Sequence, residues 1–336
     1  MKIRGVDYDL GVEYLRGISS RPTFDPDVAK REIDIIQDDL HCNAIRLNGH
    51  DIQRMLTAGE YALERGLQVW VLPKYVDATQ QDILPYLAEY ARAAESLRQK
   101  SAQVVFVAGC EYTFFLNGIL EGTNILERLG NPSNWERMRR GEHNQPLNEF
   151  LTQAVAEIRR YFHGPLTYAS IPLEKVDWSL FDYIGLDHYR EARNRNTYGE
   201  TLLRYREVGK PLVVTELGCC AYKGAEDQGG RGWMVVDGNA NPPRLNTDLV
   251  RDESVQASEI TDMLRIVDSA GAEGAFVYTF TAPTHPYNAD PKYDLDMANY
   301  SLVKNYVDRM GTTYHHLPWD PKEAFGAVAA YYSDQH

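Results

Sequence analysis

Basic residues are scarce in this chain of 336 residues. It contains 35 lysines and arginines against 48 aspartates and glutamates, which gives a formal net charge of −13 at pH 7. Binding to nucleic acid requires a surface that neutralises phosphates, so this charge argues against a nucleic-acid partner. An acidic surface is compatible with a neutral ligand but does not identify one.

Long apolar runs and a leader sequence are also missing. No run approaches the roughly 18 residues that cross a bilayer, and no basic, then apolar, segment precedes the first expected strand at Ile3. The four cysteines (42, 110, 219 and 220) have the spacing of neither a disulfide framework nor a zinc site. We therefore expect a cytoplasmic protein with reduced thiols, no membrane association and no bound metal.

Short apolar runs alternate with longer amphipathic segments along the chain. This alternation is typical of β/α units around a parallel sheet, because such strands are covered on both faces. Eight strands with right-handed crossovers favour a closed barrel over an open sheet. The sequence thus predicts an α/β fold, a (β/α)8 TIM barrel formed by residues 1–336 as one domain. The eight expected strands are Ile3–Val6, Ala44–Leu47, Val69–Leu72, Val104–Val107, Leu166–Ala169, Tyr183–Leu186, Leu212–Thr215 and Ala275–Phe280.

Helix signals lie between these runs. Asp25 before Pro26 is a typical start, and Thr79 with Asp82 resembles a capping box. We also expect Trp319-Asp320-Pro321 to open the last helix. The other expected helices are residues 26–40, 52–65, 80–100, 148–162 and 254–270.

Three connections are long, and each follows a strand. They are Tyr112–Asn148 after strand four, Leu217–Val250 after strand seven and Thr281–Pro318 after strand eight. All three therefore fall on the face formed by the carboxyl ends of the strands, where loops of this length usually carry function.

Two glutamates follow apolar strands at this functional face. Glu111 ends the fourth run and Glu216 ends the seventh, so their side chains can converge from different walls of the barrel. Glycoside hydrolysis needs two such groups, an acid that protonates the leaving oxygen and a carboxylate that attacks the anomeric carbon or activates water. Other polar residues at or after strand ends are Asp7, Tyr8, Arg46, Lys74, Asp187, His188, Tyr189 and Tyr278.

This arrangement resembles the retaining glycoside hydrolases of the 4/7 superfamily, or clan A. The segment Thr215-Glu216-Leu217-Gly218 is similar to the family's nucleophile segment, so the resemblance implies Glu216 as nucleophile and Glu111 as acid/base. It also implies that Arg46 supports the nucleophile and that His188 and Tyr189 correspond to the family's His/Tyr pair. By the same resemblance, Tyr278 or Phe280 would occupy the position at strand eight where the family often has a tryptophan.

Four further residues are expected to contact or support a substrate. Asp7 and Tyr8 follow the first strand, and Asp187 follows the sixth. Trp233 lies in a glycine-rich segment, from which an indole could stack on a sugar. With these residues, the sequence predicts hydrolysis of an O-glycoside or oligosaccharide without a cofactor, and it leaves the oligomeric state open.

One departure from the family keeps an alternative open. The family usually has asparagine immediately before its acid/base, where it bonds the sugar 2-hydroxyl, and this chain has Cys110, a weak hydrogen-bonding group. The segments 38–44 and 293–297 also resemble bacterial proteins labelled as abortive-infection proteins. The alternative is a non-catalytic carbohydrate-binding barrel with a role in phage defence.

The residues also bear on two other chemistries, metal-dependent hydrolysis and Schiff-base formation. A metal-dependent hydrolase on this fold often has His-x-His after the first strand, where this chain has Val6-Asp7-Tyr8-Asp9. Lys74 could form a Schiff base if its pKa were depressed, although a charged lysine is far more common.

Overall fold

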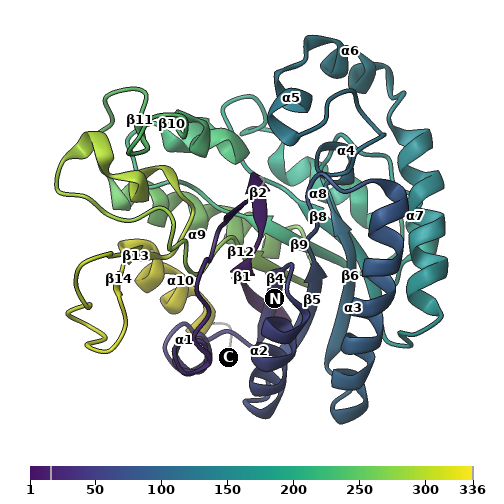
Figure 1. Ribbon diagram of the computed structural model, residues 1–336, viewed down its shortest axis with the longest axis horizontal. Coiled ribbons are helices and arrows are strands. Elements are labelled where there is room, and N and C mark those ends of the chain that lie inside the picture. The colour runs from purple at the N-terminus through teal and green to yellow at the C-terminus, as the bar shows by residue number, and fades with distance from the viewer. Residues whose placement is uncertain (16, 335–336) are drawn as a thin grey trace.

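Eight parallel strands close into a barrel in the computed structural model, which describes residues 1–15 and 17–334 (Figure 1). Each strand pairs with the next strand of the barrel along the chain, and the last pairs with the first. The (β/α)8 prediction is confirmed. The barrel strands are β1 (Ile3–Gly11), β4 (Ala44–Gly49), β5 (Gln68–Pro73), β6 (Val104–Cys110), β7 (Leu166–Ser170), β8 (Ile184–Asp187), β9 (Leu212–Leu217) and β12 (Gly274–Val277).

The strands extend farther than most of the apolar runs that predict them. β1 continues through Asp7 to Gly11, and β9 continues through Glu216 to Leu217. Because side chains alternate between the two faces of a strand, polar residues at every second position can point into the barrel without interrupting it. The polar residues expected at strand ends therefore lie partly inside the strands.

Large apolar side chains fill the part of the barrel interior near the amino-terminal ends of the strands. Trp70 on β5 and Phe276 on β12 are fully buried, and their ring centroids lie 5.0 Å apart. A Cβ atom added at Gly5 would lie 2.3 Å from the Phe276 ring, so β1 needs glycine at this position. These residues form an inner core, separate from the larger core between strands and helices, and they close the amino-terminal end of the barrel.

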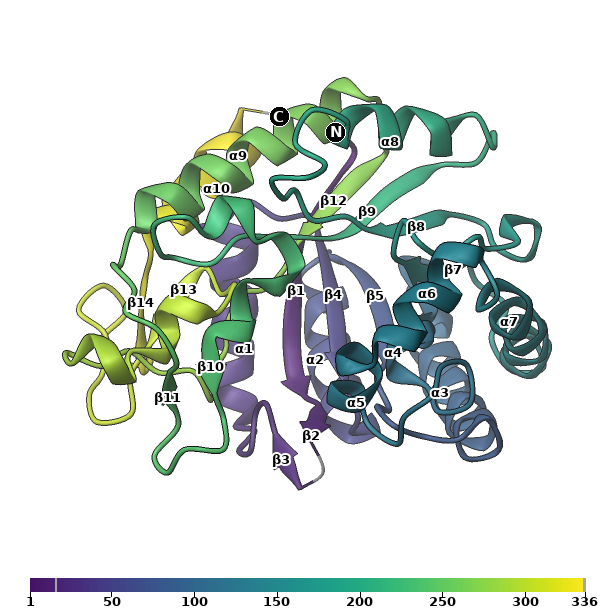
Figure 2. The same ribbon diagram turned by 90° about the horizontal axis from the view of Figure 1, so that it is seen from above.

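Helices surround the strands, as Figure 2 shows. Asp25 accepts hydrogen bonds from the first turn of α1, and the Thr79 hydroxyl both accepts from the Asp82 N–H and donates to its carboxylate. Both predicted starts are thus confirmed. The helices are α1 (Pro26–Asp38), α2 (Ile52–Glu64), α3 (Gln80–Lys100), α4 (Tyr112–Phe115), α5 (Ile125–Gly130), α6 (Pro132–Arg140), α7 (Asn144–Arg159), α8 (Tyr198–Arg206), α9 (Glu253–Ser269) and α10 (Glu323–Ser333).

The predicted start of the last helix is wrong. Residues Trp319–Pro321 form a short strand, β14, which pairs with β13 (Val303–Asn305), and α10 begins at Glu323. The Asp320 carboxylate accepts the N–H groups of Thr312 and Thr313, each at 2.8 Å, so it stabilises a loop and does not cap the helix.

The three long connections contain short elements of their own. Figures 1 and 2 both place α4, α5 and α6 on one side of the molecule and the connections after β9 and β12 on the other. None of the helices in the described part of the chain is both long and apolar enough to cross a membrane. The short elements after β9 and β12 include η2 (Ala225–Asp227), η3 (Gly229–Val235), β10 (Val236–Asp237), β11 (Arg244–Leu245), η4 (Pro291–Tyr293) and η5 (Leu295–Ala298). Outside the three long connections, β2 (Glu13–Leu15) and β3 (Ile18–Ser19) follow β1, and η1 (Trp178–Leu180) follows β7.

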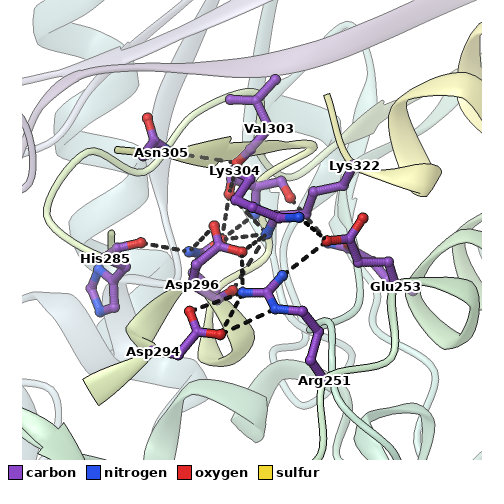
Figure 3. Close-up of polar contacts among 12 residues, drawn as sticks. Arg251, Glu253, His285, Asp294, Asp296, Val303, Lys304, Asn305 and Lys322 are labelled. Atoms are coloured by element: carbon purple, nitrogen blue, oxygen red, sulfur yellow. Dashed lines mark hydrogen bonds and ion pairs between the residues drawn. The ribbon is translucent and has the colours of Figure 1, made fainter. Parts of the chain in front are cut away.

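A network of charged side chains ties these two connections to the helices (Figure 3). Arg251, before α9, contacts Asp294 at 2.8 Å and Asp296 at 2.9 Å. Lys322, before α10, contacts Asp296 at 3.0 Å, and both of these side chains are fully buried. Each buried charge therefore has an opposite charge beside it, as burial of ions requires.

Candidate active site

The carboxylate of Glu216 is held by partners on both of its oxygens. Arg46 Nη2 donates to Oε1 at 2.9 Å, and the Tyr189 hydroxyl donates to Oε2 at 2.9 Å. Only 7% of the residue is exposed. β9 therefore presents a carboxylate in a fixed orientation inside the carboxyl end of the barrel.

Arg46 joins two acidic side chains across the barrel interior. Besides Glu216, its guanidinium contacts Asp7 Oδ2 at 3.1 Å and donates to the backbone oxygen of Thr215 at 2.8 Å. Burial alone would lower the pKa of Arg46, but the carboxylates of Glu216 and Asp7 raise it well above its ordinary value. Arg46 is therefore a permanent cation. Burial raises the pKa of its neighbour Asp7 to about 7, although the charge of Arg46 acts in the opposite direction.

Glu111 lies at the junction between β6 and α4 in a left-handed backbone conformation, with φ of 45°. One of its carboxylate oxygens lies within 4.8 Å of both Cys110 Sγ and an oxygen of Asp187. Burial, followed by the negative charges of Asp187 and Glu216, raises the pKa of Glu111 well above its ordinary value. A carboxyl group that keeps its proton in this way suits the general acid of a hydrolase.

The thiol of Cys110 lies between the two glutamates. Its sulfur is 3.7 Å from Glu216 Oε1 and within 4.8 Å of a Glu111 oxygen. These two distances are compatible with a separation of roughly 5–9.5 Å between the Glu111 and Glu216 carboxylates, the range found for the two catalytic carboxylates of glycoside hydrolases. The two strands thus bring both glutamates to one place.

Cys110 also bonds a lysine and an aspartate. Lys74 Nζ donates to the sulfur at 3.0 Å, and the thiol donates to Asp187 Oδ2 at 3.3 Å. Burial and the charge of Glu216 raise the pKa of Asp187 to about 7. Its other oxygen accepts from the Thr215 hydroxyl at 2.7 Å. The uncharged Thr215 hydroxyl and Cys110 thiol thus donate to the Asp187 carboxyl group, whose pKa is about 7.

Lys74 is held in its charged form. Burial would lower its pKa, but the neighbouring Cys110, Tyr14 and Glu216 together raise it. Schiff-base chemistry needs a neutral amine, so the surroundings of Lys74 do not support it. The same ammonium bonds Cys110, which forms a group of three potential metal ligands with Glu111 and Asp187, and it brings a positive charge to that group.

Aromatic side chains surround these polar groups. Lys74 Nζ lies 3.8 Å from the ring centroid of Phe115, and the hydroxyls of Tyr14 and Tyr278 are 3.3 Å apart. Tyr300, from the connection after β12, packs against both Tyr189 and Tyr278. Tyrosines with apolar faces and polar tips give a wall that can contact a sugar through both.

The structure brings most of the expected residues together. Asp7, Arg46 and Tyr189 lie in one contact network with Glu216, and Asp187 and Glu111 adjoin this network at Cys110. Tyr278 adjoins this network through Tyr14 and Tyr300.

Two expected residues, Tyr8 and His188, turn away from these contacts, and a third, Trp233, lies on a loop that bonds Tyr300. Tyr8 points to the outer face of β1, where its hydroxyl donates to Glu32 of α1 at 2.5 Å, because neighbouring side chains of a strand face opposite ways. His188 stacks on Tyr198 and bonds its backbone oxygen, and burial lowers the pKa of its imidazole to about 4. The Trp233 indole is partly buried and donates to Gly230 of its own loop at 3.1 Å.

Several site residues were not expected from the sequence. Asn48 follows Arg46 by two positions on β4, so strand alternation could have identified it. Tyr14, Phe115 and Tyr300 lie on connections whose path the sequence pattern does not specify.

Comparison with known proteins finds similarity of structure only. No family model matches the chain, and no curated protein matches it. A GH113 β-mannanase from Alicyclobacillus acidocaldarius superposes with a TM-score of 0.64 at 15% identity, over 99% of this chain and 98% of that one. The chain thus shares its (β/α)8 barrel fold with glycoside hydrolases.

Two further structures extend this result. A GH5-4 endoglucanase from Clostridium longisporum has a TM-score of 0.58 at 12% identity and covers 99% of this chain and 97% of its own. A β-glucuronidase from an uncultured Clostridium sp. has a TM-score of 0.59 at 13% identity and covers 99% of this chain and 50% of its own. The predicted resemblance in fold to the 4/7 superfamily is thus confirmed along the whole chain.

Proposed function

We propose that this protein is a retaining glycoside hydrolase that acts on an O-glycoside or oligosaccharide. The observation that carries the proposal is the contrast between the two glutamates. Arg46 and Tyr189 hold the carboxylate of Glu216, whereas burial and neighbouring negative charges favour the protonated form of Glu111. One group is thus suited to attack and the other to donate a proton.

In the proposed reaction, Glu216 attacks the anomeric carbon while Glu111 donates its proton to the leaving oxygen. The bond to the leaving group breaks as the bond to Glu216 forms, which gives a glycosyl ester of Glu216. Glu111, now a carboxylate, then takes a proton from water, and this water displaces Glu216 from the sugar. The protein's own side chains suffice for both steps, so no cofactor is required.

A panel of aryl β-glycosides together with a 2-deoxy-2-fluoro glycoside tests this proposal. We expect slow turnover of at least one aryl glycoside and a covalent adduct on Glu216, which peptide mass spectrometry would locate. Glu216→Gln should abolish the adduct and reduce turnover by at least about 1,000-fold, since the nucleophile is lost. Glu121→Gln, at a side chain that is 67% exposed, is the matched control and should behave as wild type.

A carbohydrate-binding barrel without turnover is the second candidate. The observation that favours it is Cys110, whose thiol is already bonded to Lys74 and Asp187 and offers a substrate little hydrogen bonding. Sugar binding without any adduct on Glu216 would support this candidate and contradict the hydrolase. A role in phage defence belongs to this second proposal.

We also propose a cytoplasmic location. All four cysteines are free and buried, which fits a reducing compartment.

A further inference from the structure

Two polar side chains of the β4–β5 wall have no part in the proposed reaction. Asn48 on β4 is 1% exposed, and its Oδ1 has no hydrogen-bond partner among the described residues. Lys74, immediately after β5, is 5% exposed. Buried polar groups are nearly always hydrogen-bonded, so an unpartnered one calls for an explanation, such as a ligand.

Strand geometry determines where Asn48 points. Ala44, Arg46 and Asn48 occupy alternate positions of β4 and therefore share one face. Ala44 belongs to the inner core of the barrel, and Arg46 reaches Glu216 across the interior. Asn48 thus faces the same interior, nearer the carboxyl end of the strand. Its neighbour in the register, Leu72 on β5, also belongs to the inner core.

Lys74 lies beside this position and has donors to spare. Its backbone N–H donates to the oxygen of Gly49, at the end of β4. Its ammonium has three protons, and within the described part of the chain its one hydrogen bond goes to the Cys110 sulfur, a weak acceptor. The ring of Phe115 covers another side of the ammonium. An unpaired acceptor and spare donors therefore lie on adjacent strands.

We infer that Asn48 and Lys74 bind a hydroxyl group of the sugar that lies over Glu216, and that the acidic side chains around them select a neutral sugar. This inference rests on the proposed function. A hydroxyl can donate its proton to Asn48 Oδ1 while its oxygen accepts from the Lys74 ammonium, so one group satisfies both side chains. β4 and β9 lie three strands apart around the barrel, so a ring over Glu216 faces this wall.

The charges at this end of the barrel explain the choice of a neutral sugar. Four acidic side chains, Asp7, Glu111, Asp187 and Glu216, are gathered around two cations, Arg46 and Lys74. A sugar carboxylate over Glu216 would lie close to the Glu216 carboxylate, whose cationic partner Arg46 is already bonded, and close like charges repel. A sugar with only hydroxyl groups avoids this repulsion.

The test compares Asn48→Leu, Asn48→Asp and the Glu121→Gln control on 4-nitrophenyl β-mannoside, β-glucoside, β-galactoside and β-glucuronide. Asn48→Leu has nearly the same volume and lacks the polar atoms, and we expect it to lower kcat/KM on the best neutral substrate by roughly 10- to 100-fold. Asn48→Asp keeps an acceptor and should retain more activity than Asn48→Leu. Circular dichroism and the melting temperature confirm that each variant is folded.

Monodeoxy versions of the best substrate identify the hydroxyl. For one of them, the kcat/KM of the wild type should fall by about the same factor as the substitution Asn48→Leu causes on the full substrate. The Asn48→Leu variant should have the same kcat/KM on that deoxy substrate and on the full substrate. Equal kcat/KM for wild type and Asn48→Leu on all four glycosides would overturn the inference. So would a preference of the wild type for the glucuronide.

Binding separates this inference from the proposed function. Glu216→Gln, titrated calorimetrically with methyl β-mannoside and methyl β-glucoside, should bind one of them, and adding Asn48→Leu should weaken that binding by a similar factor. Binding that depends on Asn48 in a protein that hydrolyses nothing would contradict the hydrolase and support the inference. Hydrolysis together with binding that does not depend on Asn48 would support the hydrolase and contradict the inference. Absence of both binding and hydrolysis would contradict the proposed function and the inference.

Discussion

Arg46 on β4 donates a hydrogen bond to Glu216 on β9 at 2.9 Å, across the inside of the barrel. The same guanidinium contacts Asp7 on β1, so one cation neutralises acids from two other strands. Arg46→Leu would leave both carboxylates buried without this partner. We expect a loss of about 3–5 kcal/mol in the free energy of unfolding, the usual effect of breaking a buried ion pair. Urea denaturation measures it.

Two variants serve as controls for this prediction. Arg46→Lys keeps the charge but lacks the planar fork, so it should recover part of the stability. Arg65→Leu removes an arginine whose side chain is 33% exposed and pairs with Asp34 and Asp38, and it should cost only about 0–1 kcal/mol. Equal losses for Arg46→Leu and Arg65→Leu would show that burial does not strengthen the Arg46 contacts.

The pH dependence of activity should reflect the proton on Glu111. Its raised pKa means that the acid form persists above the pH at which glutamate ordinarily titrates, and kcat/KM should fall as the pH rises through that pKa. Asp187 is the first neighbouring charge that raises this pKa. Asp187→Asn should therefore move the basic limb of the pH profile to lower pH. If the basic limb stays at the same pH in Asp187→Asn, the limb reflects the titration of a group other than Glu111.

Stability should depend on pH through Asp187 itself. Its pKa rises from 3.8 to about 7 in the folded protein, so between these values the folded state binds more protons than the unfolded state. Its contribution is therefore fully present below about pH 4 and is lost as the pH rises through about 7. Relative to wild type, Asp187→Asn should gain free energy of unfolding across this range. A difference that stays constant with pH would contradict the assignment.

The charged network of Figure 3 should matter more for stability than any exposed pair. Arg251→Met leaves Asp294, whose side chain is only 4% exposed, without its cation, and we expect a loss of about 3 kcal/mol. Lys100→Met breaks the 2.6 Å pair with Glu60, in which both side chains are largely exposed, and should cost about 0–1 kcal/mol. Thermal and urea unfolding of the two variants provide the comparison.

The barrel could be predicted from the sequence because its strands are buried on both faces. A run such as Val104–Val107 has no polar position, and few other folds produce eight of these in alternation with helices. The last helix was misplaced because Asp320 before Pro321 looks like a cap. The sequence does not show that the Asp320 carboxylate accepts backbone N–H groups in an earlier loop.

The candidate site could be predicted only in part. Position at the end of a strand identified Glu111, Glu216 and Arg46, since the barrel directs those side chains to one end. Tyr8 adjoins Asp7 at the end of an apolar run, but alternation along a strand turns one of any two neighbouring side chains away from the site. Tyr300 could not be identified, because it reaches the site through a connection held in place by contacts far apart in the sequence.

The inner core around Trp70 and Phe276 makes the barrel a cup with a solid floor. Molecules can enter and leave such a cup only over its rim. In the proposed two-step reaction, the water that releases the sugar from Glu216 has to arrive by the route along which the first product departs. Release of the first product must therefore come before entry of the water, because the departing fragment blocks the opening until it has left.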